Sequence, residues 1–138
     1  MPTNLIPAHG GYRKLISYQT TEIIYDATCH FCKRFIRSYK LSEQMTGAAR
    51  SGKQNIAEGC MDSGTSKKTE LKLIGVARGS LEELLLDFED YLRQNNLELW
   101  SKDHPKAQTV RSLAYKSNRS YKTYSDWLQN NHETAANT

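Results

Sequence analysis

The chain has 138 residues and a formal net charge of +4; 25% of its residues are charged and only three are proline. This composition excludes an intrinsically disordered chain, and the length predicts one domain with a single hydrophobic core. No stretch comes near the roughly 18 apolar residues of a membrane helix, and residues 1–11 lack the apolar region of a signal peptide. We therefore expect a cytoplasmic protein that does not contact a membrane.

Charge is unevenly distributed along the chain. Residues 11–40 and 102–128 each hold six lysines or arginines against two acidic residues, whereas residues 80–98 hold six acids against one arginine. Opposite charges could neutralise one another inside the fold, or the surplus of cations could form a face that binds nucleic acid. Composition alone leaves both interpretations open.

The chain is predicted to consist of a flexible arm at residues 1–10 and one helical domain at residues 11–138. Within that domain, apolar residues recur at steps of three and four over residues 12–39, from which proline and glycine are absent. This spacing is typical of an amphipathic helix, so residues 12–39 are predicted to form one long helix.

A second helix is predicted to begin at Leu41 or Ser42 and to end at Gly59. Its buried side consists largely of small residues such as Ala49 and Gly52, so another helix can approach it closely. Gly59 suits the left-handed conformation that often follows a helix, because glycine has no Cβ atom to clash with the backbone.

A third helix is predicted for residues 67–94, with the Ser66 hydroxyl capping its first turn. Its apolar stripe is broader than a two-stranded coiled-coil seam and suits the interior of a bundle. Gly75 and Gly79 each cost roughly 1 kcal/mol in helix propensity, so we expect a closely packed neighbour beside them. The connection at residues 60–65 is short enough to place the second and third helices side by side.

The C-terminal part contains only weak helical patterns. One helix is predicted from Pro105 to about Lys116, another is capped by Ser120, and residues 132–138 look like the first turn of a further helix. The sequence shows no strand pattern and no internal repeat. The predicted fold is therefore an all-α, antiparallel up-and-down helical bundle, whose three long helices need a fourth apolar surface to complete the core.

Two separated blocks of the sequence resemble a known family. QNIAEG at residues 54–59 and ARGSLEEL at residues 77–84 are similar, in order and spacing, to bacterial four-helix-bundle proteins named after the intervening sequences of 23S ribosomal RNA. LIPAHGGYRKL at residues 5–15 is similar to the variant called the four-helix-bundle suffix domain. The resemblance extends over most of residues 5–100.

The resemblance implies an up-down-up-down bundle that often assembles as a ring-like homopentamer. Some relatives, the accessory proteins of diversity-generating retroelements, bind nucleic acid and a reverse transcriptase through basic surfaces. No biochemical role follows for the suffix variant. Relatives of this variant continue past residues 133–138 into an apolar fourth helix. We therefore expect a C-terminally truncated bundle, with an apolar groove on the first and third helices left for residues 105–128 or a neighbouring subunit to cover.

Four polar residues near the predicted helix contacts are candidates for a structural network. Arg78 borders the apolar stripe of the third helix and should be at least partly buried, so it needs carboxylate partners. Glu82 lies four residues later, while Glu58 and Asn55 lie on the adjacent helix. A catalytic pair of carboxylates is the alternative. Because no nucleophile, metal triad or phosphate loop accompanies these residues, we expect no enzyme.

Two further motifs have both a chemical and a structural interpretation. Cys29 and Cys32 have the CxxC spacing, and His30 or Cys60 could complete a zinc site with them. No second such motif follows, so we interpret them as ordinary helix cysteines of a reducing compartment, with no metal or cofactor. Residues 59–68 have the glycine spacing of a phosphate loop but lack its lysine and its preceding strand, which favours a plain helix N-terminus or a phosphate contact there.

Basic residues on several predicted helices are candidates for nucleic-acid binding. Their side chains could neutralise phosphates while nearby tyrosines stack on bases. Alternatively, they form a solvated face, and the neighbouring Tyr121, Tyr124 and Trp127 pack against the bundle. The candidates are Arg13, Lys14, Lys33, Arg34, Arg37, Arg50, Lys53, Lys106, Arg111, Lys116, Arg119 and Lys122.

The function predicted from the sequence is thus binding and assembly without catalysis. Nucleic acid is the leading partner, and a ring of subunits would repeat weak basic patches and strengthen binding through multivalency. The alternative is a protein-interaction adaptor whose open apolar groove receives a helix from a partner protein.

Overall fold

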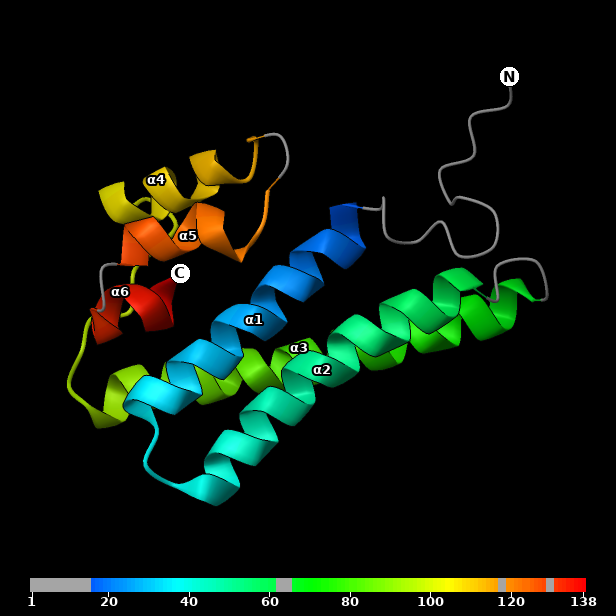
Figure 1. The fold of residues 1–138 in the computed structure, drawn as a ribbon, viewed down its shortest axis with the longest axis horizontal. Helices are drawn as coiled ribbons and strands as arrows, with labels where there is room; N and C mark the ends of the chain where they lie inside the picture. The colour runs from blue at the N-terminus through cyan, green and yellow to red at the C-terminus, as the bar shows by residue number, and fades with distance from the viewer. Residues whose placement is uncertain (1–15, 62–65, 117–118, 129–130) are drawn as a thin grey trace.

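The computed structural model describes residues 16–61, 66–116, 119–128 and 131–138, and these residues form six helices and no strand. The fold is therefore all-α, as the sequence predicts. The helices are α1 (Ile16–Phe35), α2 (Tyr39–Met61), α3 (Lys67–Gln94), α4 (Pro105–Leu113), α5 (Tyr121–Leu128) and α6 (His132–Asn137) (Figure 1). The predicted arm at residues 1–10 lies outside the described residues.

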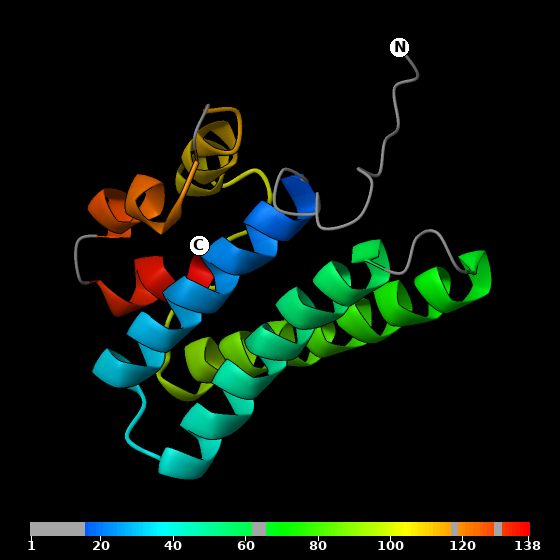
Figure 2. The same ribbon diagram turned by 45° about the vertical axis from the view of Figure 1, so that its right-hand side comes forward.

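The three long helices form an antiparallel bundle in which α2 packs against both α1 and α3. Figures 1 and 2 show α2 and α3 side by side along most of their length, while α1 crosses over them. The three short helices gather on the side of α1 that faces away from α2. The molecule thus has a compact helix pair on one side of α1 and a looser group of short helices on the other.

The hydrophobic core lies where α1, α2 and α3 meet. Met45 of α2 is completely buried, and the Sγ atom of Cys32 on α1 lies 3.9 Å from its Sδ atom. The Phe31 ring of α1 meets the Phe88 ring of α3 edge-on, with ring centroids 5.0 Å apart. Aromatic rings and sulfur atoms therefore fill the space between α1 and the other two helices.

Small residues bring α2 and α3 close together, as the sequence predicts. Gly52 is buried, and a Cβ atom added there would lie 2.7 Å from Cδ2 and 2.9 Å from Cγ of Leu81. A Cβ atom added at Gly59, also buried, would lie 3.5 Å from the Leu73 Cβ. Gly59 is helical and α2 continues to Met61, so the predicted left-handed cap is wrong. The glycine serves the close approach of α3 and not a turn.

The boundary between α1 and α2 differs from the single helix predicted for residues 12–39. α1 ends at Phe35, and α2 begins at Tyr39, two or three residues earlier than predicted. The Ser38 hydroxyl accepts the Leu41 N–H at 3.2 Å. This side-chain hydrogen bond stabilises a new helix start, and such bonds compete with continuation of the preceding helix.

α3 has the predicted bounds at both ends. The Ser66 hydroxyl accepts the Thr69 N–H at 3.3 Å and caps the first turn. At the other end Asn96 is left-handed, with a φ angle of 56°, and the Leu97 N–H donates to the Leu92 C=O at 2.8 Å. This is the hydrogen-bond pattern of a Schellman motif, which ends the helix and redirects the chain.

One face of α3 is uncovered by the rest of the described chain. A Cβ atom added at Gly75 or Gly79 would meet nothing within 4 Å, so the close neighbour expected beside these glycines is not found there. Leu71, Val76 and Leu86 of the same helix are 59%, 46% and 51% exposed. A single copy of the chain therefore leaves apolar surface of α3 in contact with water.

The short helices partly cover the groove that was expected on α1 and α3. α5 packs on α1, α6 packs on both α1 and α3, and α4 packs on α5. Asn137 fastens α6 to the chain that follows α3. Its Oδ1 atom accepts the Trp100 N–H at 2.8 Å, and its Nδ2 atom donates to the Glu98 C=O at 2.8 Å. α5 and α6 together cover the part of α1 and α3 on which a fourth bundle helix would pack.

Candidate functional site: a basic surface and an apolar cavity

The polar network predicted from the sequence does not form as expected. Its four residues are Asn55, Glu58, Arg78 and Glu82. Glu58, Arg78 and Glu82 are exposed, and no ion pair in the described part of the chain joins them. The predicted burial of Arg78 is wrong because α3 turns Ala77 and Leu84 toward its neighbours, and Arg78 lies about 100° further round the helix than Ala77.

A different polar contact joins α2 to α3. The hydroxyl groups of Ser51 and Ser80 lie 2.8 Å apart. Asn55 supports this contact, because its Nδ2 atom donates to the Ser51 C=O at 2.8 Å and to the Ser51 Oγ at 3.1 Å. The signal in the sequence was the pair of serines on faces built from small residues, where a hydroxyl group fits between closely packed helices.

The three cysteines are free thiols. Cys32 and Cys60 are buried, and burial raises the pKa of both thiols, while Cys29 is partly exposed. In the part of the chain that the structure describes, no three His, Cys, Asp or Glu side chains are grouped so that they could hold a metal ion. The helices of that part are too short or too polar to cross a membrane.

Cations and tyrosines meet along the contact between α1 and α2. The Nζ atom of Lys53 on α2 lies 5.5 Å from the ring centre of Tyr25 and 5.8 Å from that of Tyr18, both on α1. Arg50 lies one turn earlier on the same side of α2 and is exposed. Lysine over an aromatic ring is a cation–π contact, and it holds the Lys53 charge at the surface of the bundle.

The C-terminal end of α1 carries a second group of candidate cations. Lys33, Arg34 and Arg37 are all exposed there. The negative end of the helix dipole stabilises cations at this position, which gives them a structural role as well. Arg13 and Lys14, the two candidates that precede α1, lie outside the described residues.

Several candidates of the C-terminal segment make contacts within the chain. Arg111 donates to the Lys102 C=O at 2.8 Å, and the Lys106 Nζ lies 5.7 Å from the centre of the Trp100 ring. These contacts stabilise the approach to α4. Lys106, Arg111, Lys116 and Lys122 are exposed, whereas Arg119 is half-buried.

Few opposite charges are paired on the described surface. Its side-chain ion pairs are Arg93–Asp90 at 3.3 Å and His104–Glu98 at 3.7 Å. None of the candidate cations takes part in either pair. Acidic residues gather on α3 instead, where burial and the charges of the neighbouring acids raise the pKa of Asp87. The cations of α1 and α2 are therefore free to meet anions from outside the chain.

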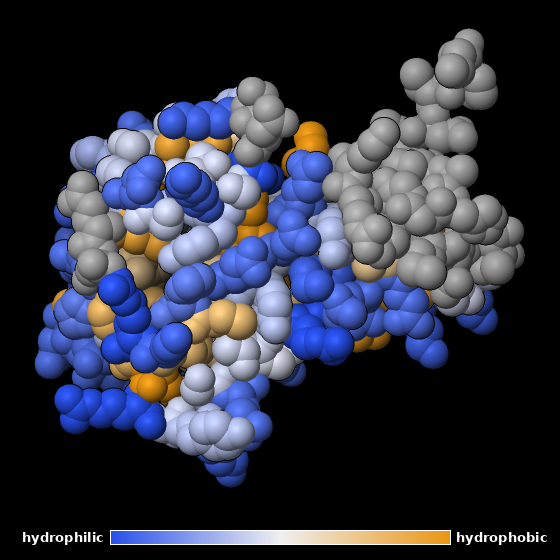
Figure 3. Space-filling model, in the orientation of Figure 1, coloured by the Kyte–Doolittle hydropathy of each residue, from blue (hydrophilic) through white to orange (hydrophobic). Residues whose placement is uncertain are grey.

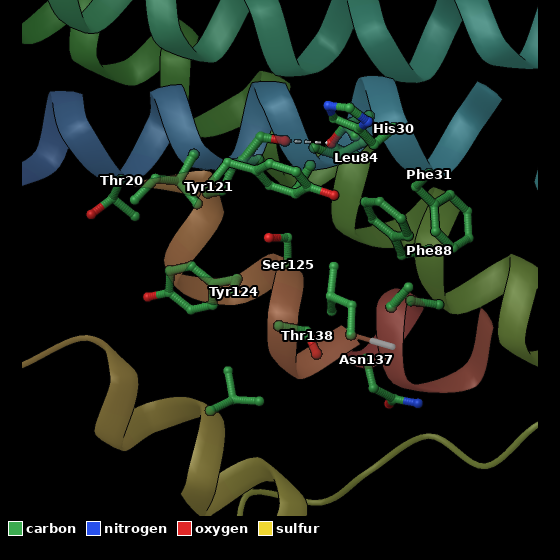
Figure 4. A pocket seen from close by; sticks show the side chains of 18 of the residues that line it. Thr20, His30, Phe31, Leu84, Phe88, Tyr121, Tyr124, Ser125, Asn137 and Thr138 are labelled. Carbon is green, nitrogen blue, oxygen red and sulfur yellow. Dashed lines mark hydrogen bonds between the residues drawn. The ribbon is translucent and has the colours of Figure 1, made fainter. Parts of the chain in front are cut away.

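A cavity of about 510 Å³ lies between α1, α3 and the three short helices. Much of its wall is apolar, with Ile24 and Phe31 from α1, Leu84 and Phe88 from α3, and Leu128 from α5. Figure 4 shows side chains from α1, α3, α5 and α6 around this space, and apolar surface is visible between α1 and α5 in Figure 3. The volume lies within the range of about 300–1,000 Å³ that is usual for small-molecule sites.

One end of the cavity is polar. Arg119 donates from Nη1 to the Tyr124 hydroxyl at 2.9 Å and from Nη2 to the Thr20 Oγ1. Figure 4 shows Thr20 and Tyr124 toward one end of the cavity, and Phe31 and Phe88 toward the opposite end. Arg119 thus connects α1 to α5 at the polar end of an otherwise largely apolar space.

The charged side chains around the cavity are all basic. Among the described residues that line it are Arg34, Arg111 and Arg119, but no aspartate or glutamate. His30 stacks on Tyr121 at the same wall, with ring centroids 4.6 Å apart, and burial raises the pKa of Tyr121. The cavity therefore combines aromatic and aliphatic walls with an excess of positive charge.

Sequence reasoning located this groove but not all of its parts. The family resemblance, with its apolar fourth helix, predicted a groove on α1 and α3 that residues 105–128 or a neighbouring subunit would cover. The contribution of Ala135, Ala136 and Asn137 from α6 was missed, because so short a segment shows no clear periodicity. Arg119 was assigned to a nucleic-acid surface, whereas its side chain lines the cavity.

Comparison with protein families connects the three-helix bundle to a known group. The profile of the family described as 23S rRNA-intervening sequence protein matches residues 14–103. This region contains α1, α2 and α3, while α4, α5 and α6 lie beyond it. Among curated proteins and among solved structures, no match to the chain is found.

Proposed function

The chain belongs to the 23S rRNA-intervening sequence protein family, and we propose that it binds nucleic acid, without catalysis, through cations at the surface of α1 and α2. The lack of ion pairs carries this proposal, because the candidate cations in the described residues have no carboxylate partners. A polyanion is the partner that such a surface attracts. Each phosphate that a lysine or arginine neutralises releases bound counterions and so favours association.

Arg50 and Lys53 form the centre of the proposed surface. Lys53 stands over Tyr25, and Lys33 lies eight residues beyond Tyr25 on α1. Eight residues of helix span about 12 Å, the length over which one strand of a duplex presents three to four phosphates. The separation of Lys53 and Lys33, measured along α1 from Tyr25, therefore suits contacts to phosphates of one strand.

Assembly into a homo-oligomer is part of the same proposal. The uncovered face of α3 exposes the apolar side chains of Leu71, Val76 and Leu86 among charged ones, beside two glycines that have open space around them. Association through this face would remove it from water and repeat the basic surface, as in the homopentamer implied by the family resemblance. Sedimentation of the wild type should show an oligomer that the Val76→Glu variant does not form. A monomeric wild type at micromolar concentration would contradict assembly.

Fluorescence anisotropy with a labelled RNA of about 30 nucleotides tests nucleic-acid binding. We expect the affinity of the wild type to fall steeply between about 50 and 200 mM salt. The double variant Arg50→Gln/Lys53→Gln should bind more weakly. It should also reduce the slope of log Kd against log salt by about 2, because two phosphate contacts are lost.

A matched control is the double variant Lys67→Gln/Lys68→Gln, which removes the same charge from two exposed lysines at the start of α3. It should leave the salt slope almost unchanged. Equal weakening by both double variants would show an effect of net charge alone and contradict the proposed surface. Absence of binding at low salt would contradict nucleic acid as the partner.

The apolar cavity favours a second candidate, an adaptor that receives a helix of a partner protein. Two turns of α-helix, taken as a cylinder about 10 Å across and 11 Å long, occupy roughly 850 Å³. This is more than the cavity's 510 Å³, so a partner helix would have to displace α5 and α6. The adaptor would be favoured over nucleic acid by two results. Binding of a partner protein should persist after nuclease treatment, and this binding should become tighter in Asn137→Ala, which loosens α6.

A further inference from the structure

We propose that the cavity between α1, α3 and the short helices binds a small amphipathic carboxylate, with a medium-length alkyl chain and a single carboxylate group. Arg119 is the residue that contacts the carboxylate, and the aromatic end of the cavity holds the alkyl chain. This site is separate from the α1–α2 surface of the proposed function and does not depend on it.

The volume and the walls of the cavity suit the alkyl chain. At about 510 Å³, the cavity is large enough for a small molecule but too small for two turns of a helix while α5 and α6 stay in place. Ile24, Phe31, Leu84 and Phe88 provide a continuous apolar wall between α1 and α3. Transfer of an alkyl chain from water to this wall is favourable by about 0.8 kcal/mol for each buried CH₂ group.

Arg119 is held in place but not neutralised. A guanidinium group has five N–H donors, and hydrogen bonds to the Tyr124 and Thr20 hydroxyls use two of them. Hydroxyl groups orient the guanidinium without compensating its charge. Three N–H donors are left, which is enough for a carboxylate that accepts two parallel hydrogen bonds.

Charge complementarity selects an anion over a neutral or cationic ligand. Among the described lining residues the charged side chains are Arg34, Arg111 and Arg119, and none of them takes part in an ion pair with another described residue. A half-buried guanidinium beside an apolar wall, with no ion-pair partner, gains from an anion that enters with its own apolar part. The polar end at Thr20 and Tyr124 and the aromatic end at Phe31 and Phe88 then match the two ends of one amphiphile.

Isothermal titration calorimetry of the delipidated full chain tests this site. The probes share one alkyl chain and differ in the head group: dodecanoate, dodecanol, dodecyl phosphate and dodecyltrimethylammonium, each below its micelle concentration. We expect dodecanoate to bind with a stoichiometry of one and about tenfold or more tightly than dodecanol, the gain from charged hydrogen bonds. Dodecyltrimethylammonium should not bind.

Two variants assign the binding to the cavity and to Arg119. Arg119→Gln should lower the affinity for dodecanoate by about tenfold, to that of dodecanol, and leave dodecanol binding unchanged. Ala27→Phe fills the cavity without removing Arg119 and should abolish binding of both probes. Arg93→Gln removes an exposed arginine of α3 that does not line the cavity, and it is the matched control that should change neither affinity.

Each contrary result overturns a stated part of the proposal. Equal affinity for dodecanoate and dodecanol, or dodecanoate binding that Arg119→Gln does not weaken, would overturn the role of Arg119. Tighter binding of dodecyl phosphate would overturn the carboxylate as the head group. Binding that Ala27→Phe leaves intact, or no saturable binding of any probe, would overturn the cavity as the site. If circular dichroism shows that Arg119→Gln does not fold, the Ala27→Phe variant and the four probes decide the matter.

Discussion

α1 contacts two regions that are packed in different ways. On one side, α2 and α3 approach so closely that a Cβ atom added at Gly52 would lie 2.7 Å from a Leu81 methyl carbon. On the other side, α5 and α6 meet α1 across a cavity of about 510 Å³. The first region is held by close packing of helix on helix, and the second by a few hydrogen bonds around an open space.

The difference lies in which residues make the contact. The α2–α3 seam uses glycine and serine, with Ser51 and Ser80 in a hydrogen bond of 2.8 Å, so that the backbones can approach. The cavity side uses aromatic rings and long side chains such as Phe31 and Arg119, which keep the helices apart. A protein that needs both a stable frame and an adaptable binding site can separate them in this way.

The largest expected effect is on the closely packed region. Gly52→Val should lower the free energy of unfolding by about 2 kcal/mol, because two extra methyl groups and a Cβ atom would overlap with Leu81. Urea denaturation followed by circular dichroism measures this change. An unaltered midpoint would mean that α2 and α3 are not held together at this glycine.

A second glycine provides the matched control. Gly75 on α3 has open space around its Cα atom, and Gly75→Ala should raise the free energy of unfolding by up to about 1 kcal/mol through helix propensity alone. Opposite signs for the two substitutions would support the contrast between a packed and an uncovered helix face. Destabilisation by Gly75→Ala in a dilute, monomeric sample would contradict the uncovered face, whereas destabilisation only at concentrations where the protein associates would place Gly75 in the proposed oligomer contact.

Much of this fold could be predicted from patterns within single helices. The apolar stripe and the Ser66 cap located α3 at both ends, because amphipathic spacing and capping are local properties. The short connection between α2 and α3 predicted their pairing. The same spacing predicted that three amphipathic helices need a fourth apolar surface, and the family resemblance placed the resulting groove on α1 and α3.

The errors arose where the outcome depends on a neighbour in space. Arg78 borders the apolar stripe of α3, but periodicity does not say which border faces α2, so its exposure was not foreseen. Gly59 could end a helix or admit a close neighbour, and both uses look the same in the sequence. The boundary between α1 and α2 is marked by one side-chain hydrogen bond, which the Ser38 hydroxyl accepts from the Leu41 N–H. The sequence has no proline or glycine there, although these residues usually mark a helix boundary.

A smaller effect is expected on the cavity side. Asn137→Ala removes the acceptor of the Trp100 N–H and the donor to the Glu98 C=O, at a cost of about 1 kcal/mol. Because these bonds fasten α6 and not the α2–α3 pair, hydrogen exchange of the amides in residues 132–137 should accelerate about fivefold while that of α2 and α3 is unchanged. Thr109→Ala on exposed α4 is the control that should change neither region. Uniform acceleration along the whole chain would show that the two regions unfold as one unit.

The smallest effect concerns the buried thiols of the bundle. Burial raises the folded-state pKa of Cys32 above the ordinary value of 9.0, so the folded protein holds this proton more tightly than the unfolded chain does. The stabilisation is complete below the ordinary pKa and is lost as the pH rises through the folded-state pKa.

The melting temperature should therefore fall between about pH 8.5 and 10, before the tyrosines ionise. The decline should be shallower in Cys32→Ala than in the wild type. Equal slopes in the two proteins would mean that the Cys32 thiol is open to water in the folded protein.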